Sequence, residues 1–262
     1  MHYQTFAPPQ DLRDLVRFWW TLESSASGSV PHRLMAETCP NIVVIRNGSF
    51  TEADGTLAPA VHLAGALTRA TDNTAQGPFS LFGTYLWPWA VQALFQREAN
   101  AVQDRFIAWG ELLPRAARQE QWPTMHAEAW FNDVADVLRR LRTDGARDAE
   151  LEEAVRSLVK DGAAGTVEEL AMNCGLARRQ FERRFKACTG FSPALFQRIL
   201  RFQRTYRLLE NGVARNLTDV ALEAGYFDQS HFIRDFKRFG GMDPKQYFRH
   251  APEKVDNFVR LP

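Results

Sequence analysis

The chain of 262 residues contains one pattern written twice, and this repeat constrains the fold more than any other feature of the sequence. The first copy spans residues 166–193, and the second spans residues 216–244 with one extra residue. The matched positions are Ala171 and Ala221, Gly175 and Gly225, Phe181 and Phe232, Phe185 and Phe236, Gly190 and Gly241, and Pro193 and Pro244. Two copies are too few for a solenoid, so the repeat predicts a duplicated supersecondary unit. We interpret each copy as a helix-turn-helix.

The first copy carries the signals for a short helix, a tight turn and a longer helix. Thr166 and Glu169 are spaced as a capping box before a predicted helix from Val167 to Asn173. Gly175 permits a tight turn that a side chain would obstruct. The second helix is predicted from about Arg178 to Cys188, with its phenylalanines toward the core.

The second copy repeats these signals in the same order. Asn216 is predicted to cap its first helix, with Asp219 at the reciprocal position. Gly225 makes the turn, and Asp228 is predicted to cap the second helix.

A long helix is predicted between the two copies. Ser192 followed by Pro193 is typical of a helix start, and apolar residues continue at helical spacing to about Glu210. Such a helix spans roughly 27 Å. Adjacent major-groove sites on one face of B-DNA lie ~34 Å apart, so one chain with both units can reach two of them.

The outward face of the second helix in each copy is predicted to read DNA bases. Arg and Lys pair with guanine, Glu accepts from cytosine, and an aliphatic side chain contacts the thymine methyl group. The predicted base-reading residues are Arg179, Glu182, Arg183 and Lys186 in the first copy and Gln229, Ser230, His231, Ile233, Arg234 and Lys237 in the second. The predicted phosphate contacts are Arg178, Arg184, Arg201 and Arg238. The alternative for either copy alone is a solvated helix face with internal pairs such as Arg178–Glu182.

Charge is distributed unevenly along the chain. Residues 1–165 hold 15 Lys and Arg against 20 Asp and Glu, a net charge of −5. Residues 166–250 hold 15 Lys and Arg against 9 Asp and Glu, a net charge of +6. This asymmetry is typical of a chain with a nucleic-acid-binding half, and double-stranded DNA is the predicted partner.

The first half is expected to be an α+β domain with antiparallel strands followed by helices. We predict a short helix from Leu12 to Trp20 and a β region over residues 30–87. Asn47-Gly48 predicts a hairpin, and Asp54-Gly55 predicts a second turn. Apolar spacing then predicts helices over residues 90–96, 104–113 and 127–142.

The polar segment 143–150 is interpreted as a linker between two domains. A helix stopped by Gly162 follows it. We place an N-terminal regulatory, effector or dimerisation domain at residues 1–145 and a DNA-binding domain of two helix-turn-helix units at residues 150–251.

Cysteine usage and hydropathy indicate a reducing compartment. Three dispersed cysteines do not suggest a disulfide framework. The sequence shows neither a signal peptide nor an apolar run of membrane-spanning length, so a cytoplasmic location without membrane contact is expected.

All seven tryptophans lie in residues 1–165, which suggests either a ligand pocket or an ordinary aromatic core. The candidate pocket residues for a small-molecule effector are Trp87, Trp89, His32 and Arg46. The histidines lack the spacing of metal ligands, so neither a metal nor a cofactor is predicted. No nucleophile–base pair or phosphate loop supports an enzyme. The alternatives are an effector-independent architectural DNA binder and an enzymatic or metal-binding first half with a DNA-binding tail.

The second copy resembles the hallmark run of the AraC/XylS family of bacterial transcriptional regulators. The matching residues are Ala221, Gly225, Tyr226, Ser230, Phe232, Arg234, Phe236, Lys237, Arg238, Gly241 and Pro244. The resemblance covers roughly residues 155–250 and implies control of transcription initiation, with RNA polymerase as a further partner. Family members often bind an effector or form a homodimer through the preceding half. Residues 9–20, 39–48 and 83–89 are similar to an uncharacterised sensor-type domain found before this module.

One residue departs from the family pattern. The family commonly has Ser or Thr where Ala177 opens the first recognition helix. A side-chain N-cap contributes ~1 kcal/mol, so this helix is expected to start less firmly than its counterpart in the second copy.

Overall fold

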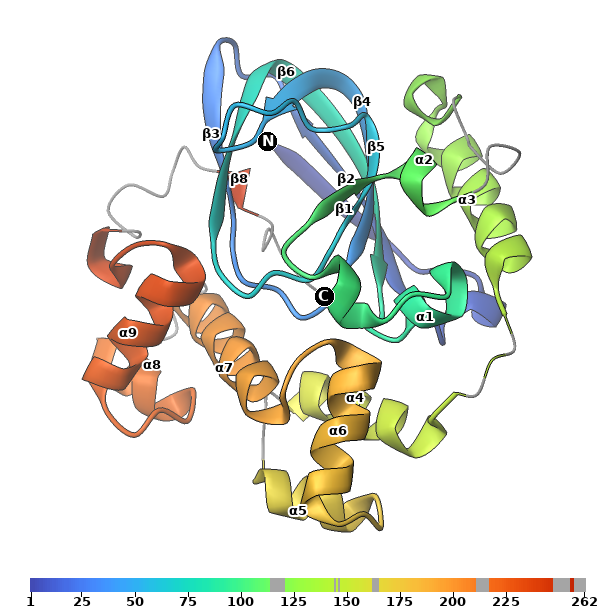
Figure 1. The fold of residues 1–262 in the computed structure, drawn as a ribbon. Helices are drawn as coiled ribbons and strands as arrows, with labels where there is room; N and C mark the ends of the chain where they lie inside the picture. Colours follow the sequence, from blue (N-terminus) through green and yellow to red (C-terminus); the bar gives the residue numbers. More distant parts are fainter. Residues whose placement is uncertain are drawn as a thin grey trace.

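The first half of the chain is built on a curved antiparallel sheet, and the second half is helical (Figure 1). The computed structural model describes residues 1–113, 121–143, 145, 147–161, 165–210, 217–246 and 255–256. The strands are β1 (His2–Phe6), β2 (Val16–Ser24), β3 (Ser29–Leu34), β4 (Asn41–Thr51), β5 (Val61–Ala64), β6 (Thr71–Leu86), β7 (Phe106–Ala108) and β8 (Val255–Asp256). The predicted antiparallel β region is confirmed.

Strand β6 is the centre of this sheet. Its first part pairs with β3 and its last part with β2, while β4 pairs along most of its length. The order of the main path is β1-β2-β6-β4-β5-β7, with β3 joined to β6 off that path. All of these pairings are antiparallel, and the short β8 joins β3 in parallel.

The predicted helix from Leu12 to Trp20 is wrong. The chain makes a 3₁₀ turn at Gln10–Leu12 and then enters β2, which pairs with β1 on one side and β6 on the other. This strand has apolar residues on both of its faces. Some of these residues are therefore three or four positions apart by coincidence, which imitates the spacing of a helix. The β-branched and aromatic residues of this strand favour the extended form.

The predicted hairpin at Asn47-Gly48 is also wrong. Strand β4 continues through these residues as a bulge, with register shifts against β6 on both sides of Asn47. Gly48 has a φ of +80°, and a Cβ there would lie 2.8 Å from the Cβ of Phe79. Gly48 is therefore the left-handed residue of a β-bulge, whereas the sequence predicts it as the left-handed residue of a turn. The turn at Asp54-Gly55 is confirmed by a hydrogen bond from Glu52 N to Thr56 O.

The helices are α1 (Ala90–Phe95), α2 (Trp109–Leu112), α3 (Ala127–Leu141), α4 (Ala149–Asp161), α5 (Val167–Asn173), α6 (Arg178–Thr189), α7 (Pro193–Glu210), α8 (Leu217–Glu223) and α9 (Gln229–Gly240). The helices predicted at 90–96 and 127–142 are confirmed. The one predicted at 104–113 is partly wrong, because its first residues form β7 and pair with β5. None of the described helices is long and apolar enough to cross a membrane.

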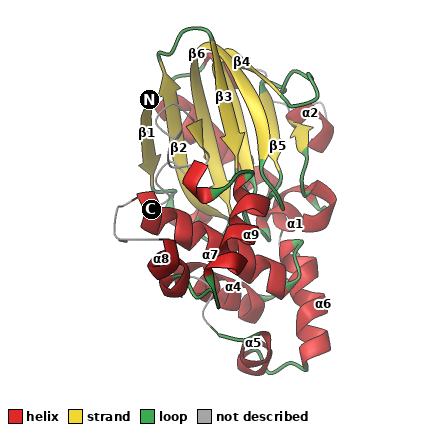
Figure 2. Ribbon diagram, turned by 90° about the vertical axis from the view of Figure 1, so that its left-hand side faces the viewer, coloured by secondary structure: helices red, strands yellow, loops and turns green. Residues whose placement is uncertain are grey.

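Helices α4–α9 gather below one end of the sheet (Figure 2). The predicted bounds of α5 and α7 are confirmed, and so is the capping box at the start of α5. Asn216 and Gly162, the predicted cap and helix stop, lie outside the described residues.

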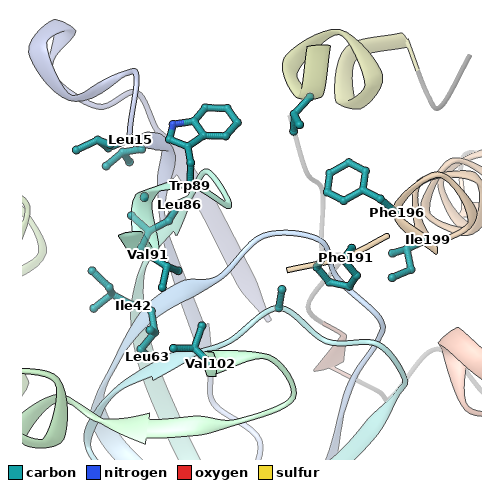
Figure 3. Packing of buried hydrophobic residues seen from close by; sticks show 14 of the residues in the cluster. Leu15, Ile42, Leu63, Leu86, Trp89, Val91, Val102, Phe191, Phe196 and Ile199 are labelled. Carbon is teal, nitrogen blue, oxygen red and sulfur yellow. The ribbon is translucent and has the colours of Figure 1, made fainter. Parts of the chain in front are cut away.

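A single cluster of buried hydrophobic side chains runs through both halves (Figure 3). Leu15 and Val102 of the first half belong to the same cluster as Phe191, Phe196 and Ile199 of the second. The two halves therefore share apolar packing, which opposes their independent movement.

The predicted linker is tied down by ion pairs. Arg142 and Arg147 both bond the carboxylate of Asp14, and Asp148 pairs with Arg184 of α6 at 2.6 Å. These pairs hold Arg142 at the end of α3 and the residues 147–148 before α4 against the rest of the chain.

Candidate nucleic-acid interface

The two predicted units have the same turn geometry. In the first, Leu176 N donates to Ala171 O at 2.9 Å and Gly175 N donates to Met172 O at 2.9 Å. In the second, the corresponding bonds run from Tyr226 N to Ala221 O at 2.9 Å and from Gly225 N to Leu222 O at 3.0 Å. Both turn glycines have positive φ, +62° and +85°, which an L side chain rarely adopts. The repeat is thus a repeat of structure.

Helix α7 holds both units through equivalent aromatic contacts. Phe196 packs edge-on against Phe185 of α6, with ring centroids 5.3 Å apart. Six residues further along α7, Phe202 packs in the same way against Phe236 of α9, also at 5.3 Å. All four side chains are fully buried. Figure 1 shows the α5–α6 unit and the α8–α9 unit on either side of α7.

The two recognition helices begin differently. Asp228 caps α9, because its Oδ1 accepts from His231 N at 2.7 Å. Ala177 precedes α6 and supplies no side-chain cap. The departure from the family pattern therefore leaves α6 without the bond that α9 has.

The outward face of α6 is basic. Arg179, Arg183 and Lys186 are exposed and form no ion pair with any described residue. Glu182 is bound by Arg178, whose Nε lies 3.0 Å from its Oε1. The Arg178–Glu182 pair, which the alternative of a solvated helix face predicts, is thus present. It involves only one side of the outward face of α6.

The outward face of α9 is mixed. Ser230 and Arg234 are exposed, and Lys237 pairs with Asp243 at 3.5 Å. Ile233 is half-buried and packs against the core, which reduces its reach toward a base. His231 lies 3.7 Å from the buried carboxylate of Asp235. Gln229 is half-buried, with its Oε1 near the Thr218 hydroxyl at 3.3 Å.

The four predicted phosphate contacts fall into two groups. Arg238 is exposed, with its guanidinium over the Phe239 ring. The other three have protein partners: Arg178 bonds Glu168 and Glu182, Arg184 bonds Asp148, and Arg201 donates to Gly225 O at 3.3 Å. The geometry gives these three a structural contact in addition to any contact with DNA.

One exposed residue beside α9 was missed by the sequence interpretation. Phe227 is 89% exposed, the highest value among the large exposed hydrophobics of the described chain. It is the extra residue of the second copy, between the turn at Gly225 and the cap at Asp228. The signal that could have found it is this insertion, because an apolar residue added at a turn has no core position to fill.

The four predicted effector residues do not form one site. A cavity of about 100 Å³ lies inside the sheet, and His32 lines it. Trp87 and Trp89 are outside it and stack on each other, 5.0 Å apart, with Arg156 over both rings. Arg46 lies over the Phe82 ring at 5.2 Å. The structure does not bring these three residues to the cavity, because their side chains pack on other faces of the domain.

The cavity wall combines apolar and polar groups. Its aromatic members include Tyr3, Trp20, Phe50, Tyr85 and Phe106, and its polar members include His32, Glu37, Cys39, His62 and Asn73. Burial raises the pKa of the Cys39 thiol to about 11, so the nucleophilic thiolate is scarce at neutral pH.

Comparison with known proteins matches both halves of the chain. A family profile described as a helix-turn-helix domain matches residues 170–250, and one described as a domain of unknown function (DUF6597) matches residues 4–108. The HTH-type transcriptional regulator MtrA of Neisseria gonorrhoeae is 28% identical over 111 residues, 42% of this chain and 36% of the relative. A putative AraC-like transcription regulator of Streptomyces antibioticus is 35% identical over 107 residues, 40% of this chain and 35% of the relative. The matched stretch spans about a third of the length of these relatives.

The arrangement of both halves is also found in a solved structure. ToxT from Vibrio cholerae aligns with 95% of this chain and 98% of its own, with a TM-score of 0.51 and 10% sequence identity. At this identity the likeness concerns the fold alone. A helix-turn-helix domain therefore follows a DUF6597 domain in this chain, and the helix-turn-helix stretch is similar to that of an AraC-like transcription regulator.

Proposed function

We propose that this protein is a sequence-specific transcriptional regulator that places α6 and α9 in successive major grooves of DNA. The N-terminal domain, residues 1–145, modulates the DNA-binding domain, residues 150–251. The relatives that share the helix-turn-helix stretch bear the names of transcriptional regulators, which supports this assignment.

One observation carries the proposal. The outward faces of α6 and α9 lie at corresponding positions of the two units. The two helices contact the same rigid helix, α7, through Phe196 and Phe202, which are six residues apart. Apart from Ile233, the residues of these faces are not part of the core, because Phe181 and Phe185, like Phe232 and Phe236, bury the opposite side of each helix. A basic face left unused by folding is a surface for phosphates and base edges.

The predicted base-reading residues differ in how free they are to bind. Arg179, Arg183, Lys186 and Arg234 are the strongest candidates, because they are exposed and carry no ion pair with described residues. Glu182 and Lys237 must give up or share a partner to reach a base. We therefore expect α6 to contribute more positive charge and α9 to contribute a more varied surface.

The shared core between the halves favours regulation over a passive tail. Ala36 N donates to Phe239 O at the end of α9, and Gly190 at the end of α6 packs against Ala99. Both recognition helices therefore end against the N-terminal domain. A structural change in the N-terminal domain would therefore alter the spacing of the two recognition helices. An architectural DNA binder without a sensor would not require such contacts. RNA polymerase and a second copy of the chain are proposed as further partners.

The test is the salt dependence of DNA binding by the full chain. Binding of a duplex selected from random DNA is measured by fluorescence anisotropy between 50 and 200 mM salt, in the range where phosphate contacts act. We expect affinity to fall by ~10³-fold for a protein that neutralises six phosphates. A flat salt response, or failure to enrich any sequence, would contradict the proposal.

A further inference from the structure

The cavity inside the sheet is formed by every strand from β1 to β7. Its volume is about 100 Å³. An apolar protein cavity of ~150 Å³ holds a benzene ring, so this one suits a small ring or short branched chain. Most of its wall is aromatic or aliphatic, which favours an apolar ligand body.

Two buried polar atoms face this space side by side. His32 on β3 and Asn73 on β6 are directly paired across the strands, so their side chains lie on the same face of the sheet. His32 Nδ1 and Asn73 Oδ1 are buried and form no hydrogen bond within the described chain. Buried polar atoms almost always have partners, and an amide oxygen can only accept, so Asn73 Oδ1 is suited to a ligand that supplies a hydrogen-bond donor.

His62 adds a third polar atom with a defined role. Its Nδ1 lies 2.7 Å from Pro59 O. A carbonyl oxygen can only accept, so Nδ1 carries the proton and Nε2 of the neutral ring keeps a lone pair. Burial lowers the pKa of both His32 and His62 to about 4, so both rings are neutral at physiological pH. His62 therefore offers an acceptor and no charge.

The wall holds no positive charge to balance an anion. None of the described lining residues is Lys or Arg. The nearby Arg17 lies behind the wall, with its guanidinium against Cys39 Sγ at 3.6 Å and over the Tyr85 ring. Burial also raises the pKa of the Glu37 carboxyl, which favours its neutral form. An anion would lose its hydration here without gaining a cationic partner, and a cation would have to share Glu37 with the neighbouring Arg17.

Glu37 connects the cavity to the DNA-binding domain. It lines the cavity and is 3% exposed. Its Oε1 accepts from Gln203 Nε2 of α7 at 3.1 Å, and also from the backbone N–H of Thr38 and Cys39. The adjacent residue, Ala36, bonds Phe239 O at the end of α9. One short segment therefore contacts the ligand space, the spacer helix and the second recognition helix.

We propose that the cavity binds a small neutral molecule, an apolar ring or branched chain bearing a hydroxyl or N–H donor, and that Glu37 transmits its presence to α7 through Gln203. The donor of the ligand bonds to Asn73 Oδ1 or to Nε2 of His62. The ligand changes the position of Glu37 and hence the bond to Gln203. The transmission rests on the proposed DNA-binding function, whereas the binding of the ligand does not.

Ligand binding is tested on the full chain with three probes of one shape: cyclopentanol, cyclopentylammonium and cyclopentanecarboxylate. A ligand that binds only the folded state raises the unfolding midpoint in a saturable way. We expect this for cyclopentanol, with at least about tenfold weaker effects of the two ions. Asn73→Leu should weaken the binding of cyclopentanol, while the variant Gln92→Ala, at an exposed residue of α1 outside the cavity, should not. Equal effects of all three probes, or saturable binding only of an ion, would overturn the ligand class.

Transmission is tested by the DNA affinity with and without saturating cyclopentanol. We expect a change of about fivefold or more in Kd for the native chain. Gln203→Met keeps the volume of the side chain and removes the bond to Glu37. This variant should still bind cyclopentanol, but its DNA affinity should no longer respond.

The outcomes separate the two claims. If the native chain binds cyclopentanol and its DNA affinity does not change, the transmission is wrong. If Gln203→Met responds like the native chain, Glu37 and Gln203 are not the route. If the chain binds no DNA at all, the proposed function fails, and the midpoint measurements still decide the ligand class.

Discussion

The two helix-turn-helix units share one backbone but use their charged residues differently. In the first unit the charges form surface pairs around α6, such as Arg178–Glu182 and Arg184–Asp148. In the second unit the main pair is internal, between Arg198 of α7 and Asp235 of α9, and Asp235 is 1% exposed. The first unit thus leaves its stabilising charges near solvent, while the second fixes its recognition helix on the spacer from within.

This difference shows how a duplicated unit can keep its core contacts while the residues of its outward surface change. The buried phenylalanines, turn glycines and α7 contacts are equivalent in both units. The outward residues differ, because α6 presents Arg179 and Glu182 where α9 presents Ser230 and Ile233. The two faces are therefore suited to two different half-sites.

The largest expected difference between the units concerns the buried pair. Asp235→Ala removes a buried carboxylate that accepts from Arg198, whose side chain is 34% exposed, and is expected to destabilise the chain by about 2 kcal/mol in urea denaturation. For comparison, Arg178→Ala in the first unit breaks only exposed pairs and should leave the midpoint nearly unchanged. Equal destabilisation by the two variants would remove the distinction between internal and surface pairing.

The second largest expected difference between the two units concerns the DNA bases that they prefer. Arg183→Ala and Arg234→Ala are each expected to lose ~1–3 kcal/mol of discrimination at one position, and the positions should lie in different half-sites. The measurement is competition binding against single-base variants of the selected site. Exposed Arg238→Ala is the control, because a phosphate contact should weaken all sequences alike. Loss at the same base position in both variants would show that the helices do not read separate half-sites.

The helix starts offer a smaller test. Asp228→Ala should cost ~1 kcal/mol of stability, because it removes the cap bond to His231 N. Ala177→Ser should gain up to ~1 kcal/mol, because α6 has no side-chain cap at present. Both are measured by urea denaturation of the full chain. If Ala177→Ser gives no gain, the start of α6 is stabilised by other contacts.

The smallest expected effect concerns Phe227, which the first unit lacks. We expect its exposed ring to contact a thymine methyl group in the half-site read by α9. Replacing that thymine with uracil should weaken the native chain by about fourfold, the value of one buried methylene, and should not affect Phe227→Ala. Leu222→Ala, another exposed apolar residue of this unit, is the control and should respond like the native chain. A native chain indifferent to every such replacement would rule out the contact.

The sequence predicted the helical half closely because its signals are local. Thr166 and Glu169 lie within one turn of each other, and Ser192-Pro193 marks the start of α7 directly. The turn glycines and buried phenylalanines follow from spacings of a few residues. Such signals depend little on the rest of the chain.

The sheet half was predicted less well because its contacts are distant in sequence. Residues 16–20 have a helical spacing of apolar side chains, but pairing with β6, more than 60 residues away, makes them a strand. The cavity depends on register such as His32 opposite Asn73, which a single sequence does not contain. Trp87, Trp89 and Arg46 had suitable chemistry for a pocket, but the direction of their side chains depends on the finished sheet.

The most direct test of two different recognition faces on one chain is selection of bound sequences from random DNA with the full native protein. The account predicts an asymmetric motif of two unlike half-sites, centred about one helical turn apart, ~10 base pairs. A motif with a single half-site, or a palindrome of two identical half-sites that each require only one of α6 and α9, would contradict it.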